Sequence, residues 1–215
     1  MNALAIAHRA GNSLAGLHRA NQLGADVIEC DVHHHRGRLE VRHLKTAGPL
    51  PFLWDRWELA SASAPRLGLA ELLAAGDRGT TFMLDLKGRS VSAGSSVARL
   101  LHESDESRPI LVCGRRWPAV DAVAELPYVR PVLSARNRAE LARLDRRLAG
   151  GPRVDGVSLH RSLLSRDVVS RMRDRVDLVM TWPVNDLRSL DCVLGHGVTG
   201  VITDVPEVLV AVLGP

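Results

Sequence analysis

The strongest constraint on the fold is an alternation in the sequence: a short apolar run is followed by a turn and then by a stretch with helical periodicity. This unit recurs eight times along 215 residues. Short apolar runs bounded by turn residues predict buried strands, and strands that alternate with helices build a parallel sheet. Eight units fit a (β/α)8 barrel at the compact end of its length range. We therefore expect an α/β protein, a single TIM-barrel domain over residues 1–215.

The boundaries of the units follow from the apolar runs and from cap and turn residues. The predicted strands are 4–8, 25–31, 80–86, 110–113, 128–133, 156–159, 178–182 and 200–202. The predicted helices are 13–23, 69–75, 91–102, 138–148, 166–173 and 187–195, with two more that start at 118 and 206. Residues 39–43 extend the second strand or pair beside it, and residues 44–65 are expected to form a loop. A doubly wound sheet is the competing architecture, but HRAGN is a poor match to its glycine-rich first turn.

Composition excludes several classes of protein. The hydrophobic fraction is 46%, which is enough for a core, and the net charge is only +4 with arginines scattered along the chain. Aromatic residues make up 3%, so neither a basic stripe nor a stacking platform for nucleic acid is expected. Three widely spaced cysteines indicate a reduced compartment rather than a disulfide framework. With no apolar run of membrane-spanning length and no basic signal-peptide region, we expect a cytoplasmic protein without a transmembrane segment.

The segment VIECDVHHH, which starts at Val27, carries two acids on one face of a predicted strand. Side chains on a strand alternate between faces, so Glu29 and Asp31 point the same way, whereas Cys30 and Val32 point to the opposite face. Two buried carboxylates side by side repel each other unless a proton or a cation lies between them. This spacing therefore predicts a metal site.

Further polar residues fall at the ends of other predicted strands, which is where barrel enzymes place their active sites. Asp85 joins Glu29 and Asp31 as a third oxygen donor suited to a hard cation such as Mg²⁺ or Ca²⁺. His8 and His43 flank the same mouth and can exchange protons near neutral pH. The remaining residues predicted at this rim are Arg9, Lys87, Cys113, His160, Trp182 and Asp204.

Two basic side chains at the rim are suited to an anionic group such as phosphate. Arg9 follows His8, and Lys87 lies two residues after Asp85 on the same strand face. Lys87 is one of only two lysines in a chain that otherwise uses arginine, so a compact ammonium at this strand end looks selected rather than incidental.

These motifs resemble the glycerophosphodiester phosphodiesterase family of the PLC-like phosphodiesterase barrels. The stretches that carry the resemblance are AHR at 7–9, GADVIECDV at 24–32, His43, PRLGLAELL at 65–73 and VMTWPVNDLRSLDCVLGHGVTGVITDVP at 179–206. The resemblance implies a barrel and a divalent metal held by Glu29, Asp31 and Asp85. It also implies that His8 and His43 act as acid and base. From their own chemistry Arg9 and Lys87 are expected to bind the phosphate, and the strand-end position of Trp182, together with the resemblance, favours a pocket wall. The expected substrates are small phosphodiesters such as glycerophosphodiesters, or lysophospholipids.

The chain departs from the usual family pattern at three points. The Pro-Glu-Asn-Thr run of relatives is Ala10-Gly11-Asn12-Ser13 here, Leu44 replaces the Asp that usually follows the second histidine, and Asp85 replaces a Glu. The shorter acid resembles the sphingomyelinase D branch of the superfamily. These departures leave two alternatives: a barrel that binds a phosphate ligand without catalysis, and a sphingomyelinase D-like phospholipase or cyclising lyase. A sugar-phosphate isomerase on the same fold is a third alternative, but it would need no cluster of three acids.

Other polar residues have simpler structural interpretations. His33, His34 and His35 are expected in an exposed turn, because neighbours on a strand point to opposite faces and cannot all ligate one ion. Cys113 is expected to be a packed thiol, and Asp204 is expected to cap the last helix. The expected loop at 44–65 contains an apolar set, Pro49, Pro51, Phe52, Trp54 and Trp57, which either covers the barrel flank or lines the mouth for an acyl chain.

Overall fold

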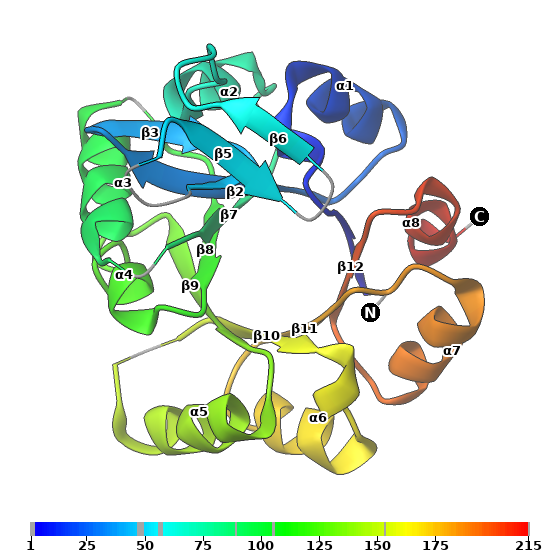
Figure 1. Ribbon diagram of the computed structural model, residues 1–215. Coiled ribbons are helices and arrows are strands. Elements are labelled where there is room, and N and C mark those ends of the chain that lie inside the picture. The colour runs from blue at the N-terminus through cyan, green and yellow to red at the C-terminus, as the bar shows by residue number, and fades with distance from the viewer. Residues whose placement is uncertain are drawn as a thin grey trace.

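Eight parallel strands form a closed barrel in the computed structural model, which describes residues 3–46, 50–55, 58–88, 90–104, 106–152 and 154–214. The strands are β1 (Leu4–Ala7), β2 (Val27–His35), β7 (Phe82–Leu86), β8 (Ile110–Gly114), β9 (Val129–Ala135), β10 (Gly156–His160), β11 (Leu178–Trp182) and β12 (Gly200–Thr203). The barrel closes because β1 pairs in parallel with β12 on one side and with β2 on the other (Figure 1). The expected TIM barrel is confirmed.

Helices surround the barrel on its outside (Figure 1). They are α1 (Leu14–Gln22), α2 (Leu69–Ala75), α3 (Ser92–Glu103), α4 (Trp117–Asp121), α5 (Arg138–Gly150), α6 (Arg166–Arg173), α7 (Leu187–Gly195) and α8 (Pro206–Leu213), with short 3₁₀ turns at Ala10–Asn12 and Arg161–Leu163. Helices α2, α6 and α7 have the predicted bounds, because each is bracketed by clear cap or stop residues. Within the described ranges, no helix combines the length and apolarity needed to cross a bilayer.

The core has two parts, one inside the barrel and one between the strands and the helices. The interior cluster consists of Ile6, Val27, Met83, Leu111, Cys113, Val132, Leu178, Met180 and Ile202. On β2, Val27 belongs to this interior cluster, whereas Cys30 and Val32 pack under the helices. The alternation predicted for β2 is therefore confirmed, and it directs Glu29 and Asp31 to the inside of the barrel.

The three consecutive histidines lie in a strand, so the expectation of an exposed turn is wrong. Strand β2 runs on to His35 and pairs with the antiparallel strand β3 (Arg38–Val41), so that His33 lies opposite Glu40. All three imidazoles are half-buried. The reversal comes at Arg36 and Gly37, which both have positive φ, and antiparallel pairing continues the strand past the barrel wall.

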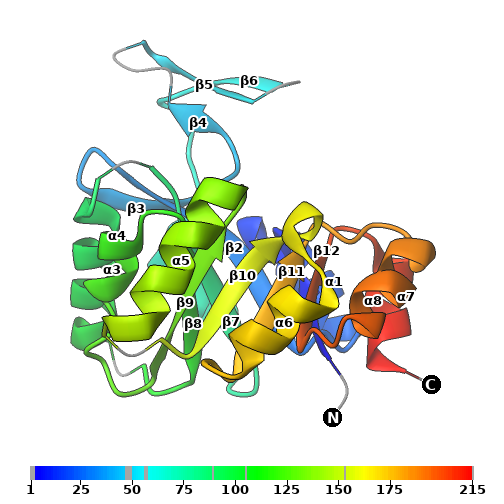
Figure 2. The same cartoon turned by 90° about the horizontal axis from the view of Figure 1, so that it is seen from below.

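Residues 44–65, expected as a loop, contain a small sheet of their own. Its antiparallel strands are β4 (Lys45–Thr46), β5 (Phe52–Asp55) and β6 (Glu58–Ser61). Figure 2 shows β5 and β6 standing clear of the barrel. Strands of two to four residues are too short to show a period-2 pattern, which is why the sequence did not reveal them. Two members of the predicted apolar set, Pro49 and Trp57, lie outside the described residues.

Helix α3 packs closely against α4 at Gly94, which faces the backbone of Ala119. A substitution at Gly94 therefore tests the packing of these two helices. A Cβ at position 94 would lie 1.9 Å from the carbonyl oxygen of Ala119 and 2.9 Å from its Cα. We predict that Gly94→Ala lowers the free energy of unfolding by roughly 1–3 kcal/mol, because backbone rather than a flexible side chain must move. Urea unfolding measures the change. Ser95→Ala, at an exposed position of the same helix, is the matched control and should not lower stability.

The burial of His33 makes stability depend on pH. Burial, followed by the charge of Arg42, lowers the pKa of His33 from 6.5 to about 3. Below pH 6.5 the imidazole of His33 is protonated in the unfolded chain but stays neutral in the folded chain. The contribution of His33 to the free energy of unfolding is therefore fully present above pH 6.5 and is lost as the pH falls. Each group of this kind changes stability by up to about 1.4 kcal/mol per pH unit.

We expect the wild-type protein to lose stability as the pH falls from about 7.5 to about 5.5. In His33→Gln this drop in the free energy of unfolding should be smaller by on the order of 1 kcal/mol. Urea unfolding at the two pH values measures it, with His102→Gln as a control at an exposed helix end. An identical pH dependence in wild type and His33→Gln would show that this side chain does not contribute.

Candidate active site

Polar side chains from five barrel strands meet at the carboxyl end of the barrel. They follow β1 (His8 and Arg9), lie on β2 (Glu29 and Asp31) and β7 (Asp85, followed by Lys87), end β11 (Trp182), or follow β12 (Asp204). His43 joins them from the segment after β3. Parallel strands bring all of their carboxyl ends to one rim, which is the reason that residues so far apart in sequence become neighbours.

Three carboxylates form one cluster. One oxygen from each of Glu29, Asp31 and Asp85 lies within 4.8 Å of the others. Asp31 and Asp85 are direct partners in the β2–β7 register. The side chain of Asp31 is fully buried and that of Glu29 almost so. Three carboxylate oxygen donors this close together are of the kind that a hard divalent cation prefers.

Asp31 is held in its charged form by its neighbours. Asn12 donates through Nδ2 to Asp31 Oδ2 at 2.8 Å and accepts from the Asp31 amide at 2.8 Å. His43 Nδ1 lies 3.1 Å from Asp31 Oδ2, and Lys87 Nζ lies 2.6 Å from Asp31 Oδ1. Burial alone would raise the pKa of Asp31, but the hydrogen bond from His43 and the charge of Lys87 hold it well below its usual range.

The pKa of Glu29 is shifted in the opposite direction. Burial, and then the charge of Asp31, raise the pKa of Glu29 to about 7. The amide of Arg9 donates to Glu29 Oε2 at 2.6 Å, and Arg9 has a left-handed backbone conformation with φ 56°. Gly11 makes this approach possible, because a Cβ there would lie 2.8 Å from the Cβ of Cys30.

His8 is oriented by a carboxylate that the sequence analysis placed in a different role. His8 Nδ1 lies 2.8 Å from Asp204 Oδ1. Asn185 donates to Asp204 Oδ2 at 3.1 Å and accepts from the Asp204 amide at 3.1 Å. The expected cap role is wrong, since Val205 is the N-cap of α8 and no side chain caps that helix. The signal that could have found Asp204 is its place at a strand end, the same criterion that selected His8.

The contact between His8 and Asp204 also affects the imidazole. Burial lowers the pKa of His8, but the hydrogen bond to Asp204 and the charge of Glu29 outweigh burial, so the pKa stands above its ordinary value. The other ring nitrogen, Nε2, lies 4.0 Å from Glu29 Oε2. His8 therefore directs Nε2 towards the carboxylate cluster, while Nδ1 on the other side of the ring contacts Asp204.

His43 lies between two carboxylates from different elements. Its Nδ1 faces Asp31, and its Nε2 lies 2.9 Å from Asp55 Oδ2 on β5. The sequence gave no reason to single out Asp55, because its contact with His43 depends on where the small sheet lies relative to the segment after β3. Asp55 supplies a carboxylate beside a histidine that is followed by Leu44 rather than by the usual Asp.

The predicted phosphate-binding and wall residues also lie at this rim. Lys87 contacts both Asp31 and Asp85, and their charges outweigh burial and raise its pKa well above the usual value. Arg9 Nε lies 3.9 Å from Asp31 Oδ2 and its side chain is 40% exposed. Trp182 is half-buried and packs on the interior cluster. Its ring meets the ring of His160 edge-on, with the two ring centroids 5.1 Å apart.

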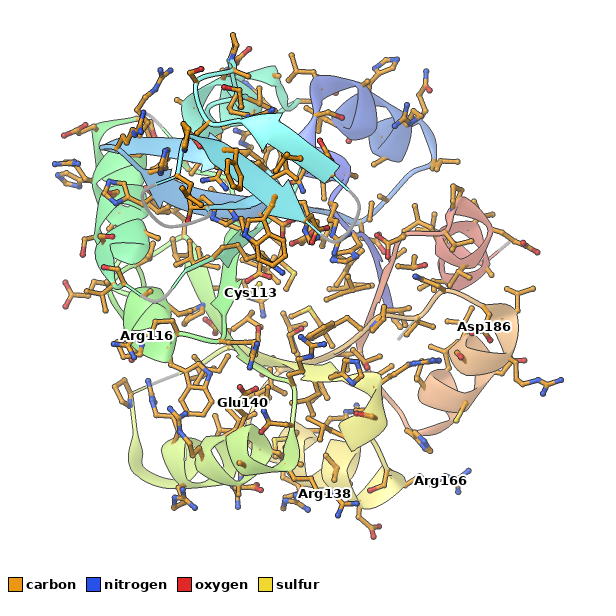
Figure 3. All side chains as sticks on the ribbon, viewed as in Figure 1. Cys113, Arg116, Arg138, Glu140, Arg166 and Asp186 are labelled. Atoms are coloured by element: carbon orange, nitrogen blue, oxygen red, sulfur yellow. The ribbon has the colours of Figure 1, made fainter. Side chains whose placement is uncertain are left out.

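Cys113 is a packed thiol, as expected. Its side chain belongs to the interior cluster, and Figure 3 labels it beside the centre of the barrel. Burial, followed by the charge of Asp85, raises the pKa of the Cys113 thiol well above its usual value. A thiol in this state is a poor nucleophile.

Solved structures share this fold over almost the whole chain. A phosphodiesterase from Oleispira antarctica, in complex with the product sn-glycerol-3-phosphate, has a TM-score of 0.78 and 18% identity, with 100% of this chain and 98% of that chain covered. A glycerophosphodiester phosphodiesterase from Thermotoga maritima has a TM-score of 0.76 and 16% identity, with 98% and 99% covered. One from Parabacteroides distasonis has a TM-score of 0.66 and 20% identity, with 99% and 97% covered.

No family model and no curated protein sequence matches the chain. At these identities the structural likeness establishes the fold, and the argument for an activity depends on the residues at the rim.

The carboxylate cluster predicts binding of a divalent cation. We expect Mg²⁺ or Ca²⁺ to stabilise the wild-type protein, by about 2.7 kcal/mol at a concentration of 100 times Kd. Asp85→Asn should weaken binding at least about tenfold, because it removes one of three anionic donors. Thermal unfolding with increasing cation and isothermal titration calorimetry measure the effect. Asp191→Asn, at an exposed position of α7, is the control. Equal cation affinity in wild type and Asp85→Asn would contradict the assignment.

Proposed function

We propose that the chain is a metal-dependent phosphodiester hydrolase of the glycerophosphodiester phosphodiesterase type. The observation that carries this proposal is a cluster of three carboxylates at one rim, flanked by two histidines that are each oriented by a further carboxylate. The proposal also rests on the sequence motifs described above and on the fold shared with solved phosphodiesterases. The proposed substrates are glycerophosphodiesters or related lysophospholipids.

Glu29, Asp31 and Asp85 would hold the cation. When bound, a divalent cation supplies positive charge beside the phosphoryl oxygens and favours ionisation of an attacking hydroxyl. Arg9, with a partly exposed guanidinium next to the cluster, is placed to donate to an oxygen of the phosphate. Lys87 offsets the negative charge of Asp31 and Asp85 and presents its ammonium to the same space.

The two histidines are suited to different halves of the reaction. When His8 donates through Nδ1 to Asp204, the lone pair on Nε2 is free to accept the proton of the attacking hydroxyl. His43 has a carboxylate oxygen within hydrogen-bond distance of each ring nitrogen, and it can donate to both only when both nitrogens carry protons. We therefore assign His8 as the general base and His43 as the general acid, which protonates the departing alcohol oxygen.

The attacking hydroxyl forms a bond to phosphorus as the bond from phosphorus to the departing oxygen breaks. If that hydroxyl belongs to the substrate, the product is a cyclic phosphate, and if it belongs to water, the product is a monoester. His8 gains one proton and His43 loses one, so exchange with solvent restores both. A phosphate-binding barrel without catalysis has less support, because Asp55 provides a carboxylate beside His43 despite the presence of Leu44.

Turnover and its metal dependence test the proposal directly. We expect the protein to cleave at least one of a glycerophosphodiester, a lysophospholipid and an aryl phosphodiester, with Mg²⁺ or Ca²⁺ present and not after chelation. His8→Ala should lower kcat roughly 10²–10⁴-fold with an unchanged far-ultraviolet circular dichroism spectrum. A folded wild-type protein that cleaves none of these substrates with any divalent cation would rule out the proposed activity.

The leaving group tests the division of roles. An aryl oxide departs without needing a proton, so His43→Ala should lose much less activity towards an aryl phosphodiester than towards an alkyl one. His8→Ala should lose activity about equally towards both, because the nucleophile still needs a base. The comparison uses kcat/KM for each enzyme and substrate. The reverse pattern would exchange the two roles.

Asp204 is predicted to act through His8. Asp204→Asn should lower kcat by roughly 10²-fold or more, because an amide no longer selects the same tautomer of the imidazole. KM should change little, since the Asp204 carboxylate contacts His8 and Asn185 and is proposed to act through the imidazole. Asp186→Asn, in the exposed cap of α7, serves as the control. A larger effect on KM than on kcat would indicate that Asp204 binds substrate instead.

A further inference from the structure

The small sheet β4–β6 has an apolar face that points away from the active site. In its register Lys45 is opposite Trp54, and Trp54 is opposite Leu59, so these three side chains share one face. Trp54 is 44% exposed and Leu59 is 70% exposed. Lys45 Nζ lies 5.5 Å from the centre of the Trp54 ring. We call Lys45, Phe52, Trp54 and Leu59 the outer face.

The opposite face of the same sheet turns towards the barrel. Leu53 is 1% exposed, and Asp55 on that face contacts His43. Since neighbours on a strand alternate, Trp54 is directed away from His43. Of the apolar set considered from the sequence, Trp54 therefore points away from the mouth and leaves 44% of its surface exposed.

A basic pocket of about 370 Å³ adjoins this sheet. Its lining includes Arg36, Arg38, Arg66, His35 and Glu40. Arg66 connects the pocket to the sheet, because its Nη2 donates at 3.2 Å to the carbonyl oxygen of Ser61, the last residue of β6. The charge of Glu40 is already paired with Arg42 at 2.7 Å, so the pocket is left with a positive charge.

Two buried nitrogen atoms of pocket residues find no hydrogen-bond partner among the described residues. Arg66 Nε and His35 Nε2 are covered from solvent and form no hydrogen bond with the described part of the protein. Arg36 and Arg38 are exposed. A buried guanidinium nitrogen without an acceptor is costly, so such a group calls for an explanation. The planar guanidinium of arginine can donate paired hydrogen bonds to two oxygens of a phosphate, which also complements its charge.

We propose that the outer face and the basic pocket form a docking surface for an anionic phospholipid bilayer. Tryptophan, with its apolar ring and polar edge, is suited to the boundary between water and lipid. Lysine and arginine are attracted to anionic headgroups, and the pocket accepts a headgroup phosphate. The surface lies outside the proposed catalytic cluster, so the proposal does not depend on the proposed function.

A bilayer fits this surface better than a second copy of the chain. In a symmetric dimer through the outer face, the same positive groups of both copies would come together. Lys45 Nζ already lies 3.9 Å from Asp55 Oδ1, so the main cations for the headgroups are the arginines of the pocket. An anionic bilayer brings negative charge to these arginines while it covers the exposed side chains of Trp54 and Leu59.

Vesicle co-sedimentation tests the proposal. The full chain, with a chelator present so that no turnover occurs, is mixed with phosphatidylglycerol vesicles or with phosphatidylcholine vesicles. We expect binding to the anionic vesicles, weaker binding at high salt, and much weaker binding to the zwitterionic ones. Arg36→Gln/Arg38→Gln should lower the partition constant on the order of tenfold. Trp54→Ala/Leu59→Ser should lower it by a similar factor of about ten.

Matched controls change similar side chains elsewhere. Arg138→Gln/Arg166→Gln removes two exposed arginines from α5 and α6, which Figure 3 shows well away from the small sheet. Leu187→Ser removes a 44% exposed leucine from α7. Both controls should bind vesicles like wild type. Thermal unfolding checks that every variant is folded, and Leu59→Ser alone provides a milder test if the double variant is not.

Four results would overturn the proposal. The first is no binding of wild type to phosphatidylglycerol vesicles, and the second is equal loss of binding in the control variants and the docking variants. The third is saturable binding of inorganic phosphate that depends on Arg36 and Arg38, without any vesicle binding, which would make the pocket a site for free phosphate. Sedimentation velocity adds a fourth: concentration-dependent dimerisation abolished by Trp54→Ala would assign the outer face to a second copy.

Discussion

Glu29 and Asp31 lie two residues apart on β2 with both carboxylates inside the barrel, where burial and mutual repulsion penalise negative charge. The surroundings of the two carboxylates affect their protonation differently. Asn12, His43 and Lys87 keep Asp31 ionised, whereas Glu29 is left with a pKa of about 7. Lys87, the Arg9 amide and the close approach of Gly11 to β2 all belong to the surroundings of this pair.

The two histidines illustrate how a barrel assembles a site from distant segments. His8 follows the first strand and is held by Asp204, which follows the last, because β1 and β12 are neighbours where the barrel closes. His43 comes from the segment after β3 and meets Asp55 of the small sheet. Closure of the barrel therefore orients His8, and the small sheet between β2 and α2 orients His43. This arrangement allows the two rings to take different parts in proton transfer.

The small sheet β4–β6 connects the active site with the surface. Its inner side contributes Asp55 to the mouth, and its outer side exposes Trp54 and Leu59. Because neighbours on a strand face opposite ways, one short segment can carry both properties. If the outer face docks on lipid as proposed, Asp55, which orients His43, is the direct neighbour of Trp54 on β5.

The sequence by itself determined the barrel, because local patterns decide where strands and helices form and eight alternating units leave few ways to connect them. It also placed Glu29, Asp31, Asp85, His8 and His43 at one rim, since strand ends in a parallel barrel share an edge. Only the tertiary structure decided which groups touch. Asp204 and Asp55 lie 196 and 12 residues from the histidines they contact, and neither has a local pattern that reports such a contact. The same reason explains the small sheet and the half-buried His33: short strands and burial depend on what packs against a segment.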